Sequence, residues 1–293
     1  MSAEHRLGID TDAFYDSGDP NREPLPIAHT SEYLDLEQYR DSRFIVMPFV
    51  SEHNLYVIKA VKENPRLLGA MLWVNPNSSA PNASEYDDIE TVESLLQKDH
   101  VVGVKMHPVF IRLPMNDKSY FPYYDAAQRN GVPVLLHASA SKKELDSPEM
   151  GQEISERFPD LKIIFAHLGG LDAKWIEPAV RLALENPNIY LNTTSLPQLG
   201  RGPRTDINTG IKSRLTDLSE DEVRSQLREA IRLLGILLSS DPQKVVAGTD
   251  IGYELPENCD LAYGIREAGE EIERMVLTEN PYRLFGKNLK PLV

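Results

Sequence analysis

The feature that most constrains this chain is a regular alternation between short apolar runs and longer segments with helical periodicity. Eight runs are rich in Val, Ile, Leu and Phe, and each is followed by a segment with apolar residues at three- or four-residue spacing. The runs lack the alternation of a half-exposed strand, so we expect strands buried on both faces of a parallel sheet. The predicted strands are 7–14, 44–49, 67–74, 101–107, 132–137, 161–167, 188–194 and 244–249.

The segments between these runs carry helix boundaries. Asn64-Pro65 and Asn186-Pro187 are stop signals, and Gly131 is typical of a helix C-terminus. The predicted helices are 31–40, 55–63, 85–98, 120–130, 149–158, 175–185, 221–238 and 261–277. Eight strand–helix pairs are the count that a closed (β/α)₈ barrel requires, and the 293 residues suit one such domain over residues 1–293. A doubly wound open sheet is the alternative, although no GxGxxG turn follows the first run.

Charge and cysteine content exclude several classes of protein. The net charge of −14 opposes binding to nucleic acid or to an anionic membrane, and no apolar stretch reaches the length of a membrane span. Cys259 is the single cysteine, which rules out an intramolecular disulfide. The N-terminus lacks the pattern of a signal peptide. We therefore expect a cytoplasmic protein that acts on a small molecule. The sequence does not decide whether it forms a homodimer.

Polar residues gather where the predicted strands end. His107, His137 and His167 close three consecutive runs, Lys105 lies on the same side as His107, and Asp250 closes the eighth. Active sites of barrels lie at the C-terminal ends of the strands, so these five are candidate catalytic residues. Two imidazoles and a carboxylate suit Zn²⁺, Mn²⁺ or Fe²⁺, and Asp250 also suits a general base. Lys105 fits a carboxylated ligand, an anion-binding cation or a base, and the sequence leaves these open.

The long segment 196–219 after the seventh run is a candidate pocket wall. Arg201 and Arg204 within it have the fork geometry to bind a substrate carboxylate, and the competing interpretation is a pair of solvated cations. Asn192 and Thr194, at the end of the preceding strand, are further candidates for substrate binding. The glycines beside Arg201 hint at a phosphate cradle, but no helix start follows them, which disfavours a phosphorylated substrate.

The motifs also resemble a known family. GVKMHPVF (103–110), PVLLHAS (133–139), FPDLKIIFAHLGG (158–170), NIYLNTTSLP (188–197) and VVAGTDIGY (245–253) are similar to the amidohydrolase-related TIM-barrel family. This is the branch of the amidohydrolase superfamily that includes lactone hydrolases and decarboxylases of small carboxylic acids. The resemblance spans nearly the whole chain, and the order and spacing of the motifs are more specific than any one of them.

The resemblance implies roles for individual residues. His137 would be the strand-five metal ligand or substrate contact, His167 the strand-six histidine, and Asp250 the strand-eight proton shuttle or ligand. The chain departs from the family at its first strand, where Asp12 and Phe14 stand in place of His-x-His. A phenylalanine cannot bind a metal, so the family's cofactor does not follow directly from the resemblance.

Three interpretations remain. In the first, one divalent ion such as Zn²⁺ is held by Asp12, His137, His167 and Asp250. In the second, no metal is used, Asp250 is the base, and Lys105 with the three histidines stabilises an oxyanion. In the third, the barrel binds a ligand without catalysis. The hypothesis that follows is hydrolysis of a small carboxylated, lactone or amide substrate, with decarboxylation as the alternative.

Overall fold

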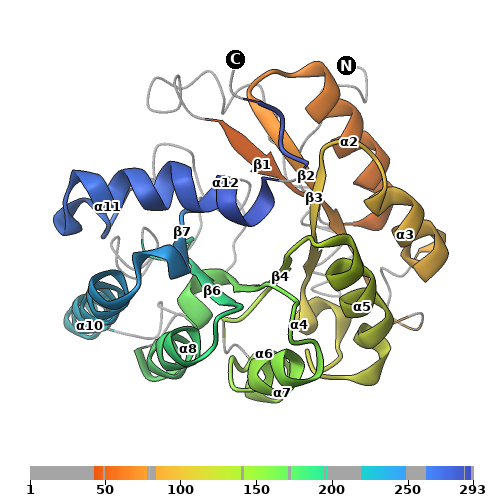
Figure 1. Cartoon of the computed structure of the whole chain (residues 1–293). Helices are drawn as coiled ribbons and strands as arrows, with labels where there is room; N and C mark the ends of the chain where they lie inside the picture. Colours follow the sequence, from red (N-terminus) through yellow and green to blue (C-terminus); the bar gives the residue numbers. More distant parts are fainter. Residues whose placement is uncertain are drawn as a thin grey trace, which may run out of the picture.

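The structure is a computed structural model that describes residues 43–48, 50–77, 79, 84–139, 142–170, 173–194, 196, 219–248, 262–286 and 288–291. Seven strands form one parallel sheet, and helices lie around it (Figure 1). The strands are β1 (Phe44–Val46), β2 (Leu67–Trp73), β3 (Val101–Met106), β4 (Val134–Leu136), β5 (Ile163–Phe165), β6 (Ile189–Asn192) and β7 (Val245–Val246). The predicted strand 7–14 and helix 31–40 lie outside the described residues.

The order of the strands identifies the architecture. Each described strand falls within a predicted run, and neighbours in the sheet are also neighbours along the chain, from β1 to β7. All six pairings are parallel. A doubly wound sheet would reverse its strand order at a switch point, which this sheet does not do. The α/β prediction is confirmed, and the arrangement is that of a (β/α)₈ barrel.

The crossover helices follow the predicted segments closely. They are α2 (Asn54–Glu63), α3 (Ile89–Leu96), α5 (Phe121–Asn130), α7 (Met150–Arg157), α8 (Ala173–Glu185) and α10 (Glu220–Ser240). Gly131 ends α5 with φ of 67°, and a capping box between Ser219 and Glu222 begins α10. Two one-turn helices, α4 (Pro108–Ile111) and α6 (Lys143–Asp146), follow β3 and β4 and were not predicted. Among the described helices, none is long and apolar enough to cross a membrane.

The prediction of one helix over 261–277 is wrong. Residues 262–269 form turns and a short 3₁₀ helix, with Gly264 and Gly269 at φ of 76° and 100°. These left-handed conformations interrupt a helix. The helical segment instead runs through α11 (Glu270–Arg274), a π-helical turn (Met275–Glu279) and α12 (Asn280–Phe285), so its C-terminal half extends beyond the predicted end.

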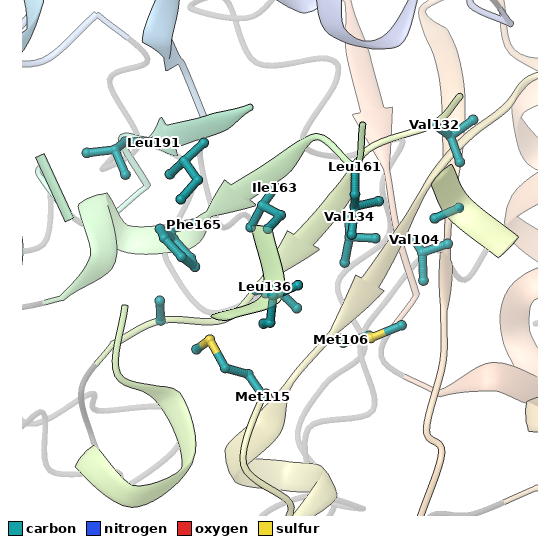
Figure 2. Packing of buried hydrophobic residues seen from close by; sticks show 14 of the residues in the cluster. Val104, Met106, Met115, Val132, Val134, Leu136, Leu161, Ile163, Phe165 and Leu191 are labelled. Atoms are coloured by element: carbon teal, nitrogen blue, oxygen red, sulfur yellow. The ribbon is translucent and has the colours of Figure 1, made fainter. Parts of the chain in front are cut away.

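Apolar side chains pack on both faces of the sheet. On the outer face, Val104, Leu136 and Ile163 lie on adjacent strands and belong to the cluster that also contains helix residues (Figure 2). A second cluster takes the intervening strand positions and fills the inside: Ile45, Met71, Val102, Leu135, Ile164, Tyr190 and Val246. Burial on both faces explains why the strand sequences are continuously apolar.

The C-terminal residues close one end of this inner cluster. Leu284, Phe285 and Leu289 pack against it. Asn288 donates to Val101 O at 2.8 Å, and the backbone N–H of Lys290 donates to Leu68 O at 3.0 Å. Both acceptors lie near the beginnings of their strands, so this segment covers the N-terminal end of the barrel and leaves the other end for a site.

Candidate active site

The register of the sheet brings the candidate residues to one end. Trp73, Lys105 and Leu135 pair across β2, β3 and β4, and form one layer. His107 and His137 lie two residues further along the chain, just past the ends of β3 and β4, and so belong to the next layer toward the C-terminal edge. Their rings stack with centroids 3.6 Å apart at 16°. The predicted convergence of Lys105, His107 and His137 is therefore seen in space.

His137 and His167 face each other. The distance from His167 Nε2 to His137 Nδ1 is 3.1 Å, and the rings meet edge to face with centroids 4.7 Å apart. His167 is buried, and His137 is mostly so, its side chain 15% exposed. Two imidazole nitrogens from adjacent strands thus point toward one location at the C-terminal end of β4 and β5.

An unusual backbone conformation places His167. Ile164 faces the inside of the barrel, so strict alternation along β5 would turn residue 167 outward. The strand instead ends at Phe165 and enters a 3₁₀ turn (Ala166–Gly169) in which His167 has φ of 59° and Leu168 has φ of 53°. Such left-handed conformations are rare for residues other than glycine and cluster at functional sites.

Thr194, two residues after the end of β6, supports His167. Its hydroxyl lies 3.0 Å from His167 Nδ1 and accepts the His167 backbone N–H at 3.2 Å. Asn192 accepts the Thr194 N–H through Oδ1 at 3.0 Å, and a Cβ at Gly248 would overlap the Asn192 side chain. Two of the four residues predicted to bind substrate, Asn192 and Thr194, are therefore part of the structure that holds His167 in place.

Two supporting residues on the other side of His137 were missed by the sequence analysis. Ser139 Oγ lies 2.8 Å from His137 Nε2, and donates to Asp146 Oδ2 at 2.9 Å. Asp146 is fully buried, and also accepts the backbone N–H groups of Ser139 and Lys142 at 3.2 and 3.0 Å. Ser139 could have been found, because it follows His137 by two residues and so lies on the same side; Asp146 depends on a loop that no local pattern predicts.

Aromatic rings hold His107. It lies between His137 and Phe110, whose ring is 3.8 Å from the imidazole and within 10° of parallel. The N–H of Phe110 donates to His107 Nδ1 at 3.4 Å, which makes His107 the N-cap of α4. The Trp73 ring lies 6.2 Å from the same imidazole. This stack fixes the plane of His107.

Burial and a neighbouring cation keep two imidazoles neutral. Burial, and then the charge of Lys105, lower the pKa of His167 to about 3. The same causes, in the same order, lower the pKa of His107 well below its ordinary value. Lys105 is only 5% exposed, and its positive charge acts on the pKa of both rings, which places its ammonium near them. The site combines neutral imidazoles with a cation that favours an anionic group.

The remaining predicted residues lie outside the described residues: Asp12, Arg201, Arg204 and Asp250. Within the described part of the chain, no group of three or more His, Cys, Asp or Glu side chains is arranged to hold a metal. His137 and His167 nevertheless fit two positions of a tetrahedral ion, because Zn–N bonds of about 2.0–2.1 Å place adjacent ligands about 3.3 Å apart. The observed separation of their facing nitrogens is 3.1 Å.

The chain is similar to proteins of known family and fold. A family model described as Amidohydrolase matches residues 32–287. A dihydroorotase of Idiomarina loihiensis is 25% identical over 243 residues, which is 76% of this chain and 66% of that protein, so the chain spans slightly less than two thirds of that relative.

Solved structures show the same fold. A probable 2-pyrone-4,6-dicarboxylic acid hydrolase of Acinetobacter baumannii has a TM-score of 0.60 at 13% identity, covering 95% of this chain and 99% of that one. An uncharacterised TIM-barrel protein of Bordetella bronchiseptica has a TM-score of 0.59 at 15% identity, covering 84% and 78%. A 5-carboxyvanillate decarboxylase of Sphingomonas paucimobilis has a TM-score of 0.51 at 16% identity, covering 84% and 79%.

Proposed function

Since the chain belongs to the amidohydrolase family, whose members here include hydrolases and decarboxylases, we propose that it hydrolyses a small carboxylated lactone or amide. The observation that supports this most directly is the facing pair His137 Nδ1 and His167 Nε2, 3.1 Å apart at the C-terminal end of the barrel. The buried charge of Lys105 beside them favours a substrate that carries an anion.

Each described residue takes a part in this proposal. Lys105 binds a substrate carboxylate or stabilises the oxyanion that forms during hydrolysis. His107, whose Nδ1 accepts the Phe110 N–H, presents a neutral Nε2–H donor. Arg201 and Arg204 bind a second anionic group, and Asp250 acts as the base that takes a proton from water. These last three roles come from the sequence.

We propose that His137 and His167 hold one divalent ion, with Asp12 and Asp250 as the further ligands. Such an ion, when bound, polarises a carbonyl and lowers the pKa of a bound water. The bonds from His137 to Ser139 and from His167 to Thr194 leave the two facing nitrogens available to it, as outer partners of metal-binding histidines do.

Activity assays test the proposed reaction. The purified protein is incubated with carboxylated lactones, cyclic amides and aromatic carboxylic acids, and ring opening and CO₂ release are followed separately. We expect ring opening, and a fall of at least about 100-fold in kcat/KM for His137→Gln and His167→Gln. His100→Gln is the matched control, because His100 bonds to Asn288 O at the opposite end of the barrel. CO₂ release without ring opening would replace hydrolysis by decarboxylation, and wild-type rates in both site variants would refute this site.

Metal analysis by inductively coupled plasma mass spectrometry tests the ion independently of activity. We expect close to one divalent ion per chain in the wild type and in His100→Gln, and a large loss in His137→Gln and His167→Gln. The reason is that removing one ligand from a site typically costs far more affinity than removing an outer partner. A protein that stays metal-free after incubation with Zn²⁺, Mn²⁺ or Fe²⁺ would contradict the proposed metal site. The metal-free interpretation, in which Lys105 and His107 stabilise an oxyanion, would then remain.

A further inference from the structure

We propose that Ser139 and Asp146 are positioning residues that hold His137 in a single tautomer, with its proton on Nε2 and its lone pair on Nδ1. The lone pair is thereby aimed at His167. The tautomer itself follows from the hydrogen bonds. Its use, to present a lone pair for binding an ion, rests on the proposed function.

Asp146 sets the direction of the hydrogen bonds. An ionised carboxylate only accepts, and Asp146 is surrounded by donors: the hydroxyl of Ser139 at 2.9 Å, the N–H of Ser139 at 3.2 Å and the N–H of Lys142 at 3.0 Å. Its side chain is fully buried, and these donors replace the water that a charged carboxylate would otherwise bind. The single hydroxyl proton of Ser139 therefore points to Asp146.

The direction of the Ser139 hydrogen bond determines which nitrogen of His137 is protonated. Because Ser139 gives its proton to Asp146, its oxygen is left as an acceptor toward His137 Nε2, 2.8 Å away. Nε2 must carry the proton, and in a neutral imidazole Nδ1 then has the lone pair. Nδ1 is the nitrogen that lies 3.1 Å from His167 Nε2. A hydrogen bond that ends on a carboxylate is among the stronger kinds, which corresponds to a preference of roughly tenfold or more for this tautomer.

His167 completes the chain of hydrogen bonds. If His167 Nε2 donates to His137 Nδ1, its own Nδ1 accepts from the Thr194 hydroxyl at 3.0 Å. If His167 instead held an ion through Nε2, its Nδ1 would carry the proton and the Thr194 hydroxyl would accept, because a hydroxyl rotates. Ser139 has no such freedom while Asp146 is ionised. The pair therefore acts on His137 in both states.

The experiment is NMR of protein labelled with ¹⁵N-histidine at pH 8, above the ordinary pKa of imidazole. The His137 signals are those lost in His137→Gln. We expect a protonated, pyrrole-type Nε2 and an unprotonated, pyridine-type Nδ1 in the wild type. In Asp146→Asn the carboxylate charge that attracts the Ser139 proton is lost, so we expect the share of His137 protonated at Nε2 to fall. In Ser139→Ala the preference of His137 for protonation at Nε2 over Nδ1 should fall from about tenfold to about that of a free imidazole.

Asp87→Asn is the matched control. Asp87 is also buried, and its Oδ2 also accepts a serine hydroxyl, that of Ser51, at 2.9 Å. The same oxygen accepts the N–H of Ser84, and Oδ1 accepts the N–H of Asn75. No imidazole is part of that network among the described residues, so the His137 spectrum should not change. A wild-type His137 protonated at Nδ1 would overturn the proposal even if no variant folds. So would an unchanged His137 spectrum in folded Asp146→Asn. The spectrum needs no substrate, so these results are independent of the proposed reaction.

Discussion

At the scale of single residues, the same side chain takes different roles according to what surrounds it. His107 is stacked between two rings, His137 lies in a chain of hydrogen bonds, and His167 reaches the cluster through a left-handed backbone. Asp146 and Asp87 are both buried carboxylates that accept one serine hydroxyl and two backbone N–H groups. Among the described residues, only Asp146 is linked to an imidazole, that of His137 through Ser139, and this difference makes the pair useful in experiments.

Asp87 should make stability depend on pH. Burial raises its pKa to about 6, although hydrogen bonds from Asn75, Ser84 and Ser51 oppose the shift. Between the unfolded pKa of 3.8 and the folded pKa of about 6, the native state binds more protons than the unfolded chain. The stability contributed by protonation is complete below the unfolded pKa and is lost as pH rises through 6. Relative to Asp87→Asn, the wild type should gain about 1 kcal/mol in free energy of unfolding between pH 7 and pH 5.

Urea denaturation of both proteins at the two pH values measures this gain. Comparing the difference between two proteins removes the effect of every other titrating group. Asp88→Asn is the neighbouring control, because hydrogen bonds from the hydroxyl and N–H of Thr91 lower the pKa of Asp88. Relative to Asp88→Asn, the wild type should not gain free energy of unfolding between pH 7 and pH 5. A wild type that loses stability relative to Asp87→Asn at pH 5 would show that the pKa of Asp87 is not raised.

At the scale of elements, close contacts set how near a helix lies to the sheet. Gly151 in α7 faces Phe165 at the end of β5, and a Cβ there would overlap the fully buried ring. Phe165 immediately precedes the turn that carries His167. The packing contact between α7 and β5 therefore lies next to the site, although neither Gly151 nor Phe165 belongs to the site.

Gly151→Ala should lower the free energy of unfolding by about 1–3 kcal/mol, because it overpacks the contact with Phe165. Gly235→Ala in α10 is the matched change, since nothing lies within 4 Å of a Cβ at that position. It should raise the free energy of unfolding by about 0.5–1 kcal/mol, because alanine loses less backbone entropy in a helix. Chemical denaturation compares the two. A stabilising Gly151→Ala would show that α7 can move away from β5 without cost.

At the scale of the whole molecule, the barrel is closed by the far end of the chain. Leu284 and Phe285 of α12, with Leu289, cover the inner cluster at the N-terminal end of the strands. Lys290 also reaches the carbonyls of Val61 and Asn64 at the end of α2. In Figure 1 the C-terminal segment lies against the strands that begin the described chain. The first and last parts of the described sequence therefore stabilise each other.

Leu284→Ala should lower the free energy of unfolding by about 2–4 kcal/mol, because Leu284 is 3% exposed and its removal leaves a cavity at the barrel end. Leu184→Ala on the outside of α8 is the control, since Leu184 is 40% exposed and should cost about 0.5 kcal/mol or less. Unfolding in urea measures both. Equal effects would mean that the C-terminal segment does not close the core.

The sequence by itself determined the seven described strands and most of the described crossover helices, and it singled out the three histidines, because hydrophobic periodicity and strand ends are local properties. It failed over 261–277, where Gly264 and Gly269 adopt left-handed conformations that a helical pattern of apolar residues does not reveal. Tertiary structure alone decided the turn that brings His167 inward, the stack around His107 and the partnership of Ser139 with Asp146. These depend on contacts between separate loops and strands, and no periodicity along the chain encodes such contacts.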